Sequence, residues 1–468
     1  MPRSLQPDRR LFGTTLALCL IGAVMVFSAS AITSSDEHGS AYYFLLRQLA
    51  WLALGVGGMF ALMNFDYRKL RQPKVIFTAL SITLTMLIAV FFLDRSHDTH
   101  RWIRYGSFSL QPSELAKLAL IVFLAWFLEI RTGPRGFGVN DLRRTLLPAL
   151  GTVLLVVALV YKEPDMGTAC MIFFIAAVML FVAGLSFKYI GIAAAAAMPV
   201  VYFAVAGSAY RLQRVETFFS PGSDPQGHGF QLLQSLIAVG SGGFSGVGLM
   251  ESRQKLFFLP EAHTDFIFSV IAEELGYIGA VIVIVLFAIY GWRALVSAMK
   301  APDDFGRYLG IGIATMVVGQ ALINLSVVLG LVPTKGIPLP FISYGGSNLL
   351  GMLLATGVLL NISGGSDLAL AEVHEAAQIV AEVVDPEANI IFGAVLHPKL
   401  EGQFKITLIA TGFERSYSPQ ARKDHRPAIQ QEQPAPEPPP SRQRPSYLDY
   451  KRPESGDLDT PAFLRRRD

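Results

Sequence analysis

Charged residues are scarce in this chain of 468 residues. They make up 16% of it, whereas soluble proteins contain about a quarter. Hydrophobic residues make up 52%, and they are concentrated in long apolar runs that precede a polar C-terminal part. This composition excludes an ordinary soluble protein and predicts an integral membrane protein with a soluble tail.

Cysteines are rare, and a common nucleotide-binding motif is missing. Cys19 and Cys170 both lie in apolar runs, so the sequence predicts neither a disulfide framework nor a cysteine-rich metal site. The phosphate-binding pattern GxxxxGK[ST] does not occur. Any energy for a reaction must therefore come from the substrate itself.

The apolar runs predict about ten membrane helices, each near the ~20 residues that cross a bilayer. The first run follows MPRSLQPDRR without a small-residue cleavage site, so we interpret it as a membrane helix rather than a signal peptide. The predicted spans are 11–31, 43–64, 74–93, 112–130, 145–161, 166–184, 188–206, 265–292, 306–331 and 343–361.

Lysine and arginine are more frequent in the loops on one side of these spans than on the other. The positive-inside rule therefore predicts that both termini are cytoplasmic, with residues 1–10 as the N-terminal segment, and that the loop 207–264 is extracytoplasmic. A loop of this length usually carries function or its own structure. The predicted fold class is an all-α polytopic membrane protein with about ten transmembrane helices and one large extracytoplasmic loop.

Four segments concentrate polar residues at the predicted outer membrane edge. They are RWIRYGSFSLQPSELAK (101–117), KEPDMG (162–167), SRQKLFFLPEAHTDF (252–266) and VPTKGIPLPFISYGGSN (332–348). Their candidate substrate-binding residues are Arg101, Glu114, Lys117, Asp165, Lys255, Glu261, His263, Lys335 and Ser343. Some of these have an equally good structural explanation, since Arg101 suits the headgroup zone and Lys335 is able to snorkel.

Charged residues inside the predicted spans are more informative. Glu114 and Lys117 form an i,i+3 pair one turn into a span, where charge is costly and usually functional, with a structural ion pair as the alternative. Glu273 and Glu274 lie deeper in another span, and we interpret them as hydrogen-bond partners between helices rather than catalysts.

Asp265 is the strongest single candidate. Thr264 is a plausible N-cap, which would place Asp265 at the positive end of the following helix. Complementing the helix dipole is worth less than ~1 kcal/mol, and it would explain a single acid at this position. It does not explain why Glu261 and His263 lie at the same depth of the membrane edge. A carboxylate at a half-dry membrane edge can have its pKa tuned so that it acts as a base. His263 would serve the same purpose or orient a neighbour.

These clusters suit a substrate with a polar head on a lipid anchor. Basic groups would hold a diphosphate. A carboxylate would take a proton from an attacking hydroxyl, while the apolar spans would accommodate the lipid tail.

The segments RWIRYGSFSLQPSELAK, EPDMGTA, LPEAHTDFIFSVIAEELGYIG and LVPTKGIPLPFISYGGSNLL resemble the signature segments of the SEDS family (shape, elongation, division and sporulation proteins). The resemblance covers about residues 8–362 and is closer to the division branch than to the elongation branch. It implies a peptidoglycan glycosyltransferase of the bacterial cytoplasmic (inner) membrane that polymerises lipid II at the division septum. It also implies a monofunctional penicillin-binding transpeptidase and other division proteins as partners.

The resemblance carries residue roles as well. Asp265 corresponds to the acid that the family requires, and Glu114 and Lys117 to its conserved pair. The implied reaction is an inverting transfer in which Asp265 deprotonates the acceptor hydroxyl, while Arg101, Lys117 and Lys255 offset the charge of the leaving diphosphate. A divalent cation, Mg²⁺ or Mn²⁺, would be able to assist, although no metal-ligand spacing indicates one.

Two other functions remain open at this point. A lipid II flippase would need polar residues at several depths, and Glu273, Glu274 and Asn324 supply some of them. A membrane scaffold that recruits division proteins is the third alternative, but it leaves Asp265 unexplained. We expect no nucleic-acid partner.

The C-terminal part resembles a different family. Residues 357–413 are similar to the C-terminal half of FtsZ, a tubulin-like division GTPase, and 456–468 to its terminal peptide. We predict a membrane domain over 11–362, a partial α+β fragment over 363–413 and a disordered linker over 414–455, which is rich in Pro, Gln and Arg. The nucleotide-binding half of FtsZ is missing, so we expect neither GTP binding nor GTPase activity.

The junction itself contains the stretch GVLLNIS, which ends a membrane helix in one family and forms a strand in the other. The preceding apolar run favours the helix. Two origins remain open, namely a genuine fusion and an accidental join of neighbouring genes. We favour the accidental join, because a selected fusion would keep a complete domain.

Overall fold

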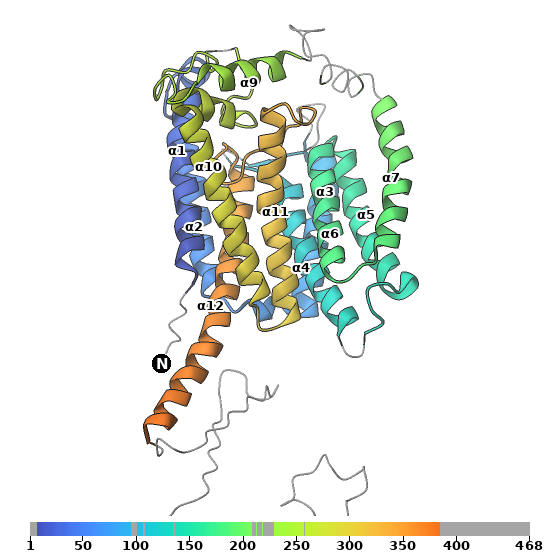
Figure 1. Cartoon of the computed structure of the whole chain (residues 1–468). Helices are drawn as coiled ribbons and strands as arrows, with labels where there is room; N and C mark the ends of the chain where they lie inside the picture. Colours follow the sequence, from blue (N-terminus) through green and yellow to red (C-terminus); the bar gives the residue numbers. More distant parts are fainter. Residues whose placement is uncertain are drawn as a thin grey trace, which may run out of the picture. The chain divides into compact units, whose positions relative to one another are not determined.

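The computed structural model describes residues 7–94, 101–105, 108–133, 136–207, 212, 218, 229–256 and 258–383. The long helices run side by side, and the short helix α9 lies across one end of the bundle (Figure 1). The helices are α1 (Arg9–His38), α2 (Tyr43–Met63), α3 (Pro73–Leu93), α4 (Pro112–Thr132), α5 (Leu147–Lys162), α6 (Met166–Val182), α7 (Phe187–Ala206), α9 (Phe230–Ser241), α10 (Ile267–Met299), α11 (Asp304–Val328) and α12 (Gly346–Val383).

Shorter elements connect them. The 3₁₀ turn η1 (Tyr67–Arg71) precedes α3, and η2 (Leu142–Leu146) leads directly into α5. A two-stranded antiparallel hairpin, β1 (Ile103–Tyr105) and β2 (Phe108–Leu110), precedes α4. The sequence did not predict this hairpin, so the described part of the chain is mostly helical rather than all-α.

Seven helical stretches of the described chain are long and apolar enough to cross a membrane. They are α1, α2, α3, Leu142–Lys162, α10, α11 and Gly346–Gly364 of α12. Each of the ten predicted spans overlaps a helix, but the count of ten spans stays a prediction. The helix α4 contains Glu114, Lys117, Glu129 and Arg131, and the apolar helix α6 has only 17 residues.

The helix α11 lies inside the bundle and packs against α10, α4 and α6. Most of its side chains are buried, whereas α2 and α3 bury only a narrow stripe. Large apolar side chains such as Leu54, Phe77 and Phe92 are exposed on α2 and α3. This is the pattern of a helix bundle whose outer surface is covered by lipid, because lipid tails accept apolar side chains as readily as a protein core does.

The helix α10 is broken at Gly276, whose φ of 67° lies in the left-handed region that favours glycine. The loop 242–248 satisfies the backbone groups that the break exposes. Two of its amides donate to the carbonyl oxygens of Glu273 and Glu274, and two of its carbonyls accept from the amides of residues 277 and 278. The glycine-rich loop and the broken helix are therefore one structural unit.

The helix α12 continues without interruption through GVLLNIS, so the helical interpretation of that stretch is confirmed. Its polar residues anchor it in the bundle. Asn361 accepts a hydrogen bond from the amide of Tyr67 and donates one to the carbonyl of Met63, and Ser363 accepts one from the amide of Asp8. The predicted fragment 363–413 lies in the same helix as far as Val383, and its remainder, the predicted linker and the terminal peptide lie outside the described residues.

Candidate active site

A cavity of about 550 Å³ lies where the loops at one end of the bundle meet the first turns of α4, α6 and α12. Six of the predicted site residues line it, namely Arg101, Glu114, Asp165, Glu261, Asp265 and Lys335. Lys117, Lys255, His263 and Ser343 are not part of its lining. The structure therefore brings together most of the candidates from segments that are far apart in the sequence.

Asp265 lies in the turn that precedes α10. The helix begins at Ile267 and its N-cap is Phe266, so the predicted N-cap role of Thr264 is wrong. The Thr264 hydroxyl instead donates to the carboxylate of Glu261 at 2.6 Å. Glu261 has a left-handed backbone, with φ of 57°, and its carbonyl accepts from the amides of Thr264 and Phe266. This tight turn sets Asp265 on the cavity wall, two residues before the helix.

The Asp265 carboxylate packs against the main chain of Gly336, in the loop that joins α11 to α12. A Cβ atom added to Gly336 would lie 2.7 Å from Oδ2 of Asp265. The adjacent Lys335 lines the same cavity. The predicted base and a basic side chain thus share one wall of the cavity.

Ser343 and His263 hold the turn against this loop. The Ser343 hydroxyl donates to the carbonyl of Thr264 at 2.6 Å and accepts from the amide of Leu339 at 2.8 Å. The amide of Tyr344 donates to the carbonyl of His263 at 3.0 Å. Both predicted site residues therefore contribute to the architecture of the site, and neither lines the cavity.

The imidazole of His263 packs between aromatic rings, 4.8 Å from the centroid of Phe44 and 5.6 Å from that of Tyr344. Burial lowers the pKa of His263, against the opposing effect of Glu261 and Glu37. Its placement among aromatic rings, outside the cavity lining, supports the orienting role over the role of a base.

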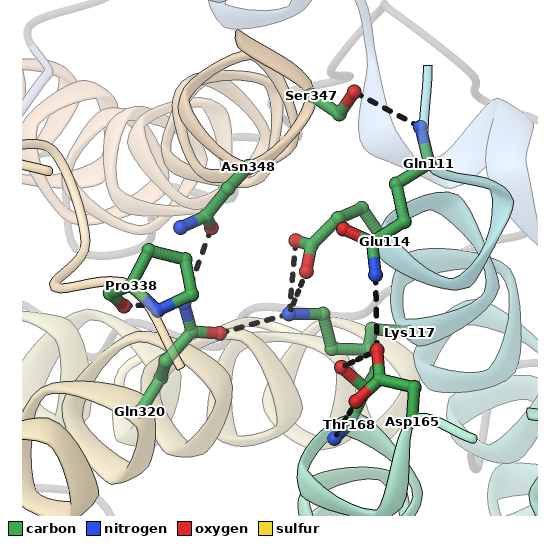
Figure 2. Close-up of polar contacts among 9 residues, drawn as sticks. All are labelled: Gln111, Glu114, Lys117, Asp165, Thr168, Gln320, Pro338, Ser347 and Asn348. Atoms are coloured by element: carbon green, nitrogen blue, oxygen red, sulfur yellow. Dashed lines mark hydrogen bonds and ion pairs between the residues drawn. The ribbon is translucent and has the colours of Figure 1, made fainter. Parts of the chain in front are cut away.

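Glu114 and Lys117 form a buried ion pair with an N–O distance of 2.9 Å (Figure 2). The Lys117 ammonium also donates to Oε1 of Gln320 in α11 at 2.8 Å. Because the Lys117 side chain is only 2% exposed, its charge is neutralised inside the bundle rather than offered to the cavity. Sequence reasoning missed Gln320, since a single amide in an apolar helix gives no local signal of its partners.

Asp165 is the N-cap of α6. Its carboxylate accepts from the amide and hydroxyl of Thr168 and from the side-chain amide of Gln111, at 3.0, 2.8 and 2.9 Å (Figure 2). An N-cap of this type stabilises a helix by ~1 kcal/mol. Asp165 therefore fixes the start of α6 and ties it to the segment before α4.

Arg101 is held by the turn between α5 and α6. Its guanidinium donates to the carbonyl oxygens of Glu163 and Pro164. The carboxyl group of Glu163 is fully buried, and neither oxygen has a hydrogen-bond partner among the described residues. Burial and the neighbouring Asp165 raise the pKa of Glu163 to about 8, with Arg101 opposing the shift. Glu163 is therefore mostly protonated at pH 7.

Lys255 lies away from the cavity. Its ammonium forms a buried ion pair with Glu274 at 2.8 Å, and Glu274 also accepts from the hydroxyl of Ser28 in α1. Glu273 accepts from the hydroxyl of Ser252 and the amide of Arg253. The predicted helix-to-helix role thus fits Glu274, which bonds to α1, whereas Glu273 bonds to the loop before α10.

The cavity lining combines acidic and basic side chains. Arg101, Arg104 and Lys335 contribute positive charge, and Glu114, Asp165, Glu261 and Asp265 contribute carboxylates. Within the described residues, no three His, Cys, Asp or Glu side chains are close enough to hold a metal ion.

The fold and this cavity define a polytopic membrane protein with a charged site at one end of its helix bundle. Residues 9–367 match the model of the cell cycle protein family that includes FtsW, RodA and SpoVE, so the chain belongs to that family. The SEDS resemblance is thereby confirmed. Residues 347–414 match the C-terminal domain of the FtsZ family, which confirms the second resemblance over 357–413. The resemblance of 456–468 to the terminal peptide stays a prediction.

Relatives and solved structures agree with this assignment. The chain is 43% identical to a probable peptidoglycan glycosyltransferase FtsW of Trichlorobacter lovleyi, over 77% of this chain and 94% of that one. It is 41% identical to the stage V sporulation protein E of Bacillus subtilis, over 76% and 97%. A chain of a peptidoglycan synthase complex superposes with a TM-score of 0.64 at 32% identity, and RodA of Thermus thermophilus with 0.56 at 29%. These structures cover 77% of this chain and 99% and 98% of theirs.

Proposed function

We propose that this protein is a peptidoglycan glycosyltransferase that polymerises lipid II into glycan strands during cell division. Family membership and the names of its relatives support the activity. The observation that carries the proposal is the position of Asp265. Its carboxylate lies on the wall of a charged cavity. The turn before α10 carries it, and the loop at Gly336 packs against it.

In the proposed reaction Asp265 removes the proton from the 4-hydroxyl of the acceptor's GlcNAc unit. The oxygen then attacks C1 of the donor's MurNAc unit and forms the new glycosidic bond. The bond between C1 and the diphosphate breaks at the same time, so that C1 is inverted and undecaprenyl diphosphate leaves with the bonding electrons. The proton stays on Asp265 until solvent takes it up.

The leaving diphosphate gains negative charge, and cavity-lining cations are suited to offset it. Arg101, Arg104 and Lys335 meet this requirement. Lys117 and Lys255 do so less well than the sequence predicted, because both are buried and each is already paired with a glutamate. We therefore assign diphosphate binding to the first three residues.

Membrane placement and partners follow from the same proposal. The cavity end of the bundle would face outward, where polymerisation takes place, and both termini would be cytoplasmic at the septum. A solved relative is part of a complex that coordinates polymerization and crosslinking. By analogy, a transpeptidase partner would crosslink the strands that this protein makes.

A flippase would need polar residues inside the bundle that are available to the lipid head. Here these residues already have partners within the protein. Glu274 pairs with Lys255, and Gln320 and Asn324 donate hydrogen bonds to loop carbonyls. These contacts favour catalysis at the cavity over passage of a polar head through the bundle.

Reconstitution with labelled lipid II distinguishes the alternatives. Purified protein with its transpeptidase partner should convert lipid II into glycan strands that separate on a gel. Translocation of lipid II in liposomes without any strand formation would support the flippase. Neither activity from correctly folded protein with its partner present would support the scaffold.

A further inference from the structure

The helix α11 carries two buried amide side chains one turn apart. Gln320 and Asn324 are each 1% exposed and lie on the same face of the helix. Buried amides are costly unless they are hydrogen-bonded, so their partners indicate why they are present.

Both amides bind the loop that carries Lys335 and Gly336. Nε2 of Gln320 donates to the carbonyl of Pro338 at 2.9 Å, and Nδ2 of Asn324 donates to the carbonyl of Ile337 at 2.7 Å (Figure 2 shows the first). These two consecutive carbonyls follow Gly336 directly. The loop is therefore fixed to α11 at the point where it supports the Asp265 carboxylate.

Asn324 makes a second contact on the other side of the site. The same Nδ2 atom donates to the backbone carbonyl of Asp265 at 2.7 Å. One side chain thus connects the main chain of Asp265 to the loop against which its carboxylate packs.

The buried ion pair sets the orientation of Gln320. An ammonium is a donor only, so the Lys117 ammonium requires the oxygen of the Gln320 amide to face it. The amide nitrogen is then directed toward Pro338 and the side-chain oxygen of Asn348. Glu114 in turn fixes Lys117. The chain of contacts runs from the ion pair through Gln320 to the loop beneath Asp265.

We propose that Asn324 and Gln320, with the Glu114–Lys117 pair behind Gln320, are positioning residues that hold the Asp265 carboxylate and the Lys335–Pro338 loop in register. Asn324 and Gln320 act through main-chain carbonyls, and neither lines the cavity, so neither binds lipid II. This inference rests on the proposed function, in which Asp265 is the base.

A positioning role predicts a specific kinetic pattern. A displacement of ~1 Å in a catalytic group can cost about 100-fold in rate. Asn324→Ala should therefore lower kcat roughly 10- to 100-fold while KM for lipid II changes by less than about threefold. Gln320→Met keeps the volume of the side chain, and should lower kcat in the same direction even where Asn324→Ala folds poorly.

Asn361, near the middle of α12, offers a matched control that does not line the cavity. It is also a buried asparagine with two hydrogen bonds to main-chain groups, those of Met63 and Tyr67. Asn361→Ala should lower the melting temperature as much as Asn324→Ala does. Because it does not touch the site, it should leave kcat of the folded fraction unchanged.

Measuring Asp265→Asn beside these variants separates the inference from the proposed function on which it rests. Suppose that Asp265→Asn is inactive but that Asn324→Ala and Asn361→Ala have the same kcat. This result would overturn the positioning role and leave the proposed function intact. Native activity in Asp265→Asn would overturn the proposed base, and the inference with it. A raised KM with unchanged kcat in Gln320→Met would assign these residues to substrate binding instead.

Discussion

Gly336 lies against the carboxylate that the proposed mechanism uses, so adding one methyl group there perturbs the site selectively. In Gly336→Ala the new Cβ would lie 2.7 Å from Oδ2 of Asp265, whereas ordinary contact begins at 3.4 Å. The carboxylate must therefore retreat by about 0.7 Å. The backbone of Gly336 lies outside the left-handed region, so alanine introduces no backbone strain.

The expected result is a loss of rate without a loss of stability. The displaced atom is the end of a flexible side chain, so the melting temperature should change little. A shift of this size should lower kcat roughly 10- to 100-fold, since ~1 Å can cost about 100-fold. The assay is the initial rate of glycan strand formation from labelled lipid II, with thermal unfolding measured in the same detergent.

Gly345 supplies the control, because it lines the same cavity and also has an ordinary backbone. A Cβ atom added there would meet only Cβ of Asn348, at 3.8 Å. Gly345→Ala should therefore keep the native rate. Equal rates in Gly336→Ala and Gly345→Ala would refute the claim that the carboxylate must occupy its observed position.

The remaining predictions concern a buried acid, two lysines and the tail. The pKa of Glu163 is about 8 in the folded protein, whereas its ordinary value is 4.5. Between these two pH values the folded protein keeps a proton that the unfolded chain releases. The free energy of unfolding therefore falls as the pH rises from 4.5 to 8. Thermal unfolding across this range should show a flatter pH dependence in Glu163→Gln, and an unchanged dependence would exclude Glu163 as its source. Lys255→Met leaves Glu274 buried and unpaired, so it should lower the free energy of unfolding by ~3–5 kcal/mol. Lys335→Met should instead raise KM for lipid II at nearly native stability. A raised KM in Lys255→Met and a loss of stability in Lys335→Met would exchange their roles. A chain that ends at residue 367 should polymerise lipid II at the native rate, because the last polar anchor of α12 among the described side chains is Ser363. A loss of folding on truncation would show that the tail supports the bundle.

The helices were predictable because an apolar environment forces the backbone to satisfy its hydrogen bonds within each segment. Composition therefore located a helix at every predicted span. Composition was less informative about whether α4 crosses the membrane, because this helix contains charged residues. Two of them, Glu114 and Lys117, neutralise one another inside the bundle. Local patterns were misleading at Thr264, because the left-handed Glu261 closes a turn that delays the helix until Ile267.

The sequence predicted which segments form the site. It did not predict which side chains within them pair with one another. Hydrogen bonds between residues far apart in the chain decide whether a charge faces the cavity or is neutralised. Lys255 and Lys335 look alike in the sequence, yet one pairs with Glu274 and the other lines the cavity. Gln320 and Asn324 were not recognised as partners of the loop, because their acceptors are main-chain carbonyls that any residue could supply.

The junction shows a similar competition between two patterns. Residues 347–367 are shared by the two family matches, and the structure gives this stretch to the membrane helix. Asn361 and Ser363 are bonded to α1, α2 and η1, so the segment is committed to the bundle. We therefore expect the FtsZ-like part to lack the strand that this stretch forms in its own family.

The most direct test of the account compares Asp265→Asn with Asp304→Asn in a polymerisation assay with labelled lipid II and the transpeptidase partner. Asp304 is a partly exposed aspartate at the other end of α11, paired with Arg307, so its replacement controls for the loss of one carboxylate. Asp265→Asn should retain lipid II binding and form no glycan strands, while Asp304→Asn should form them at the native rate. Strand formation by Asp265→Asn at the native rate would contradict the assignment of Asp265 as the base.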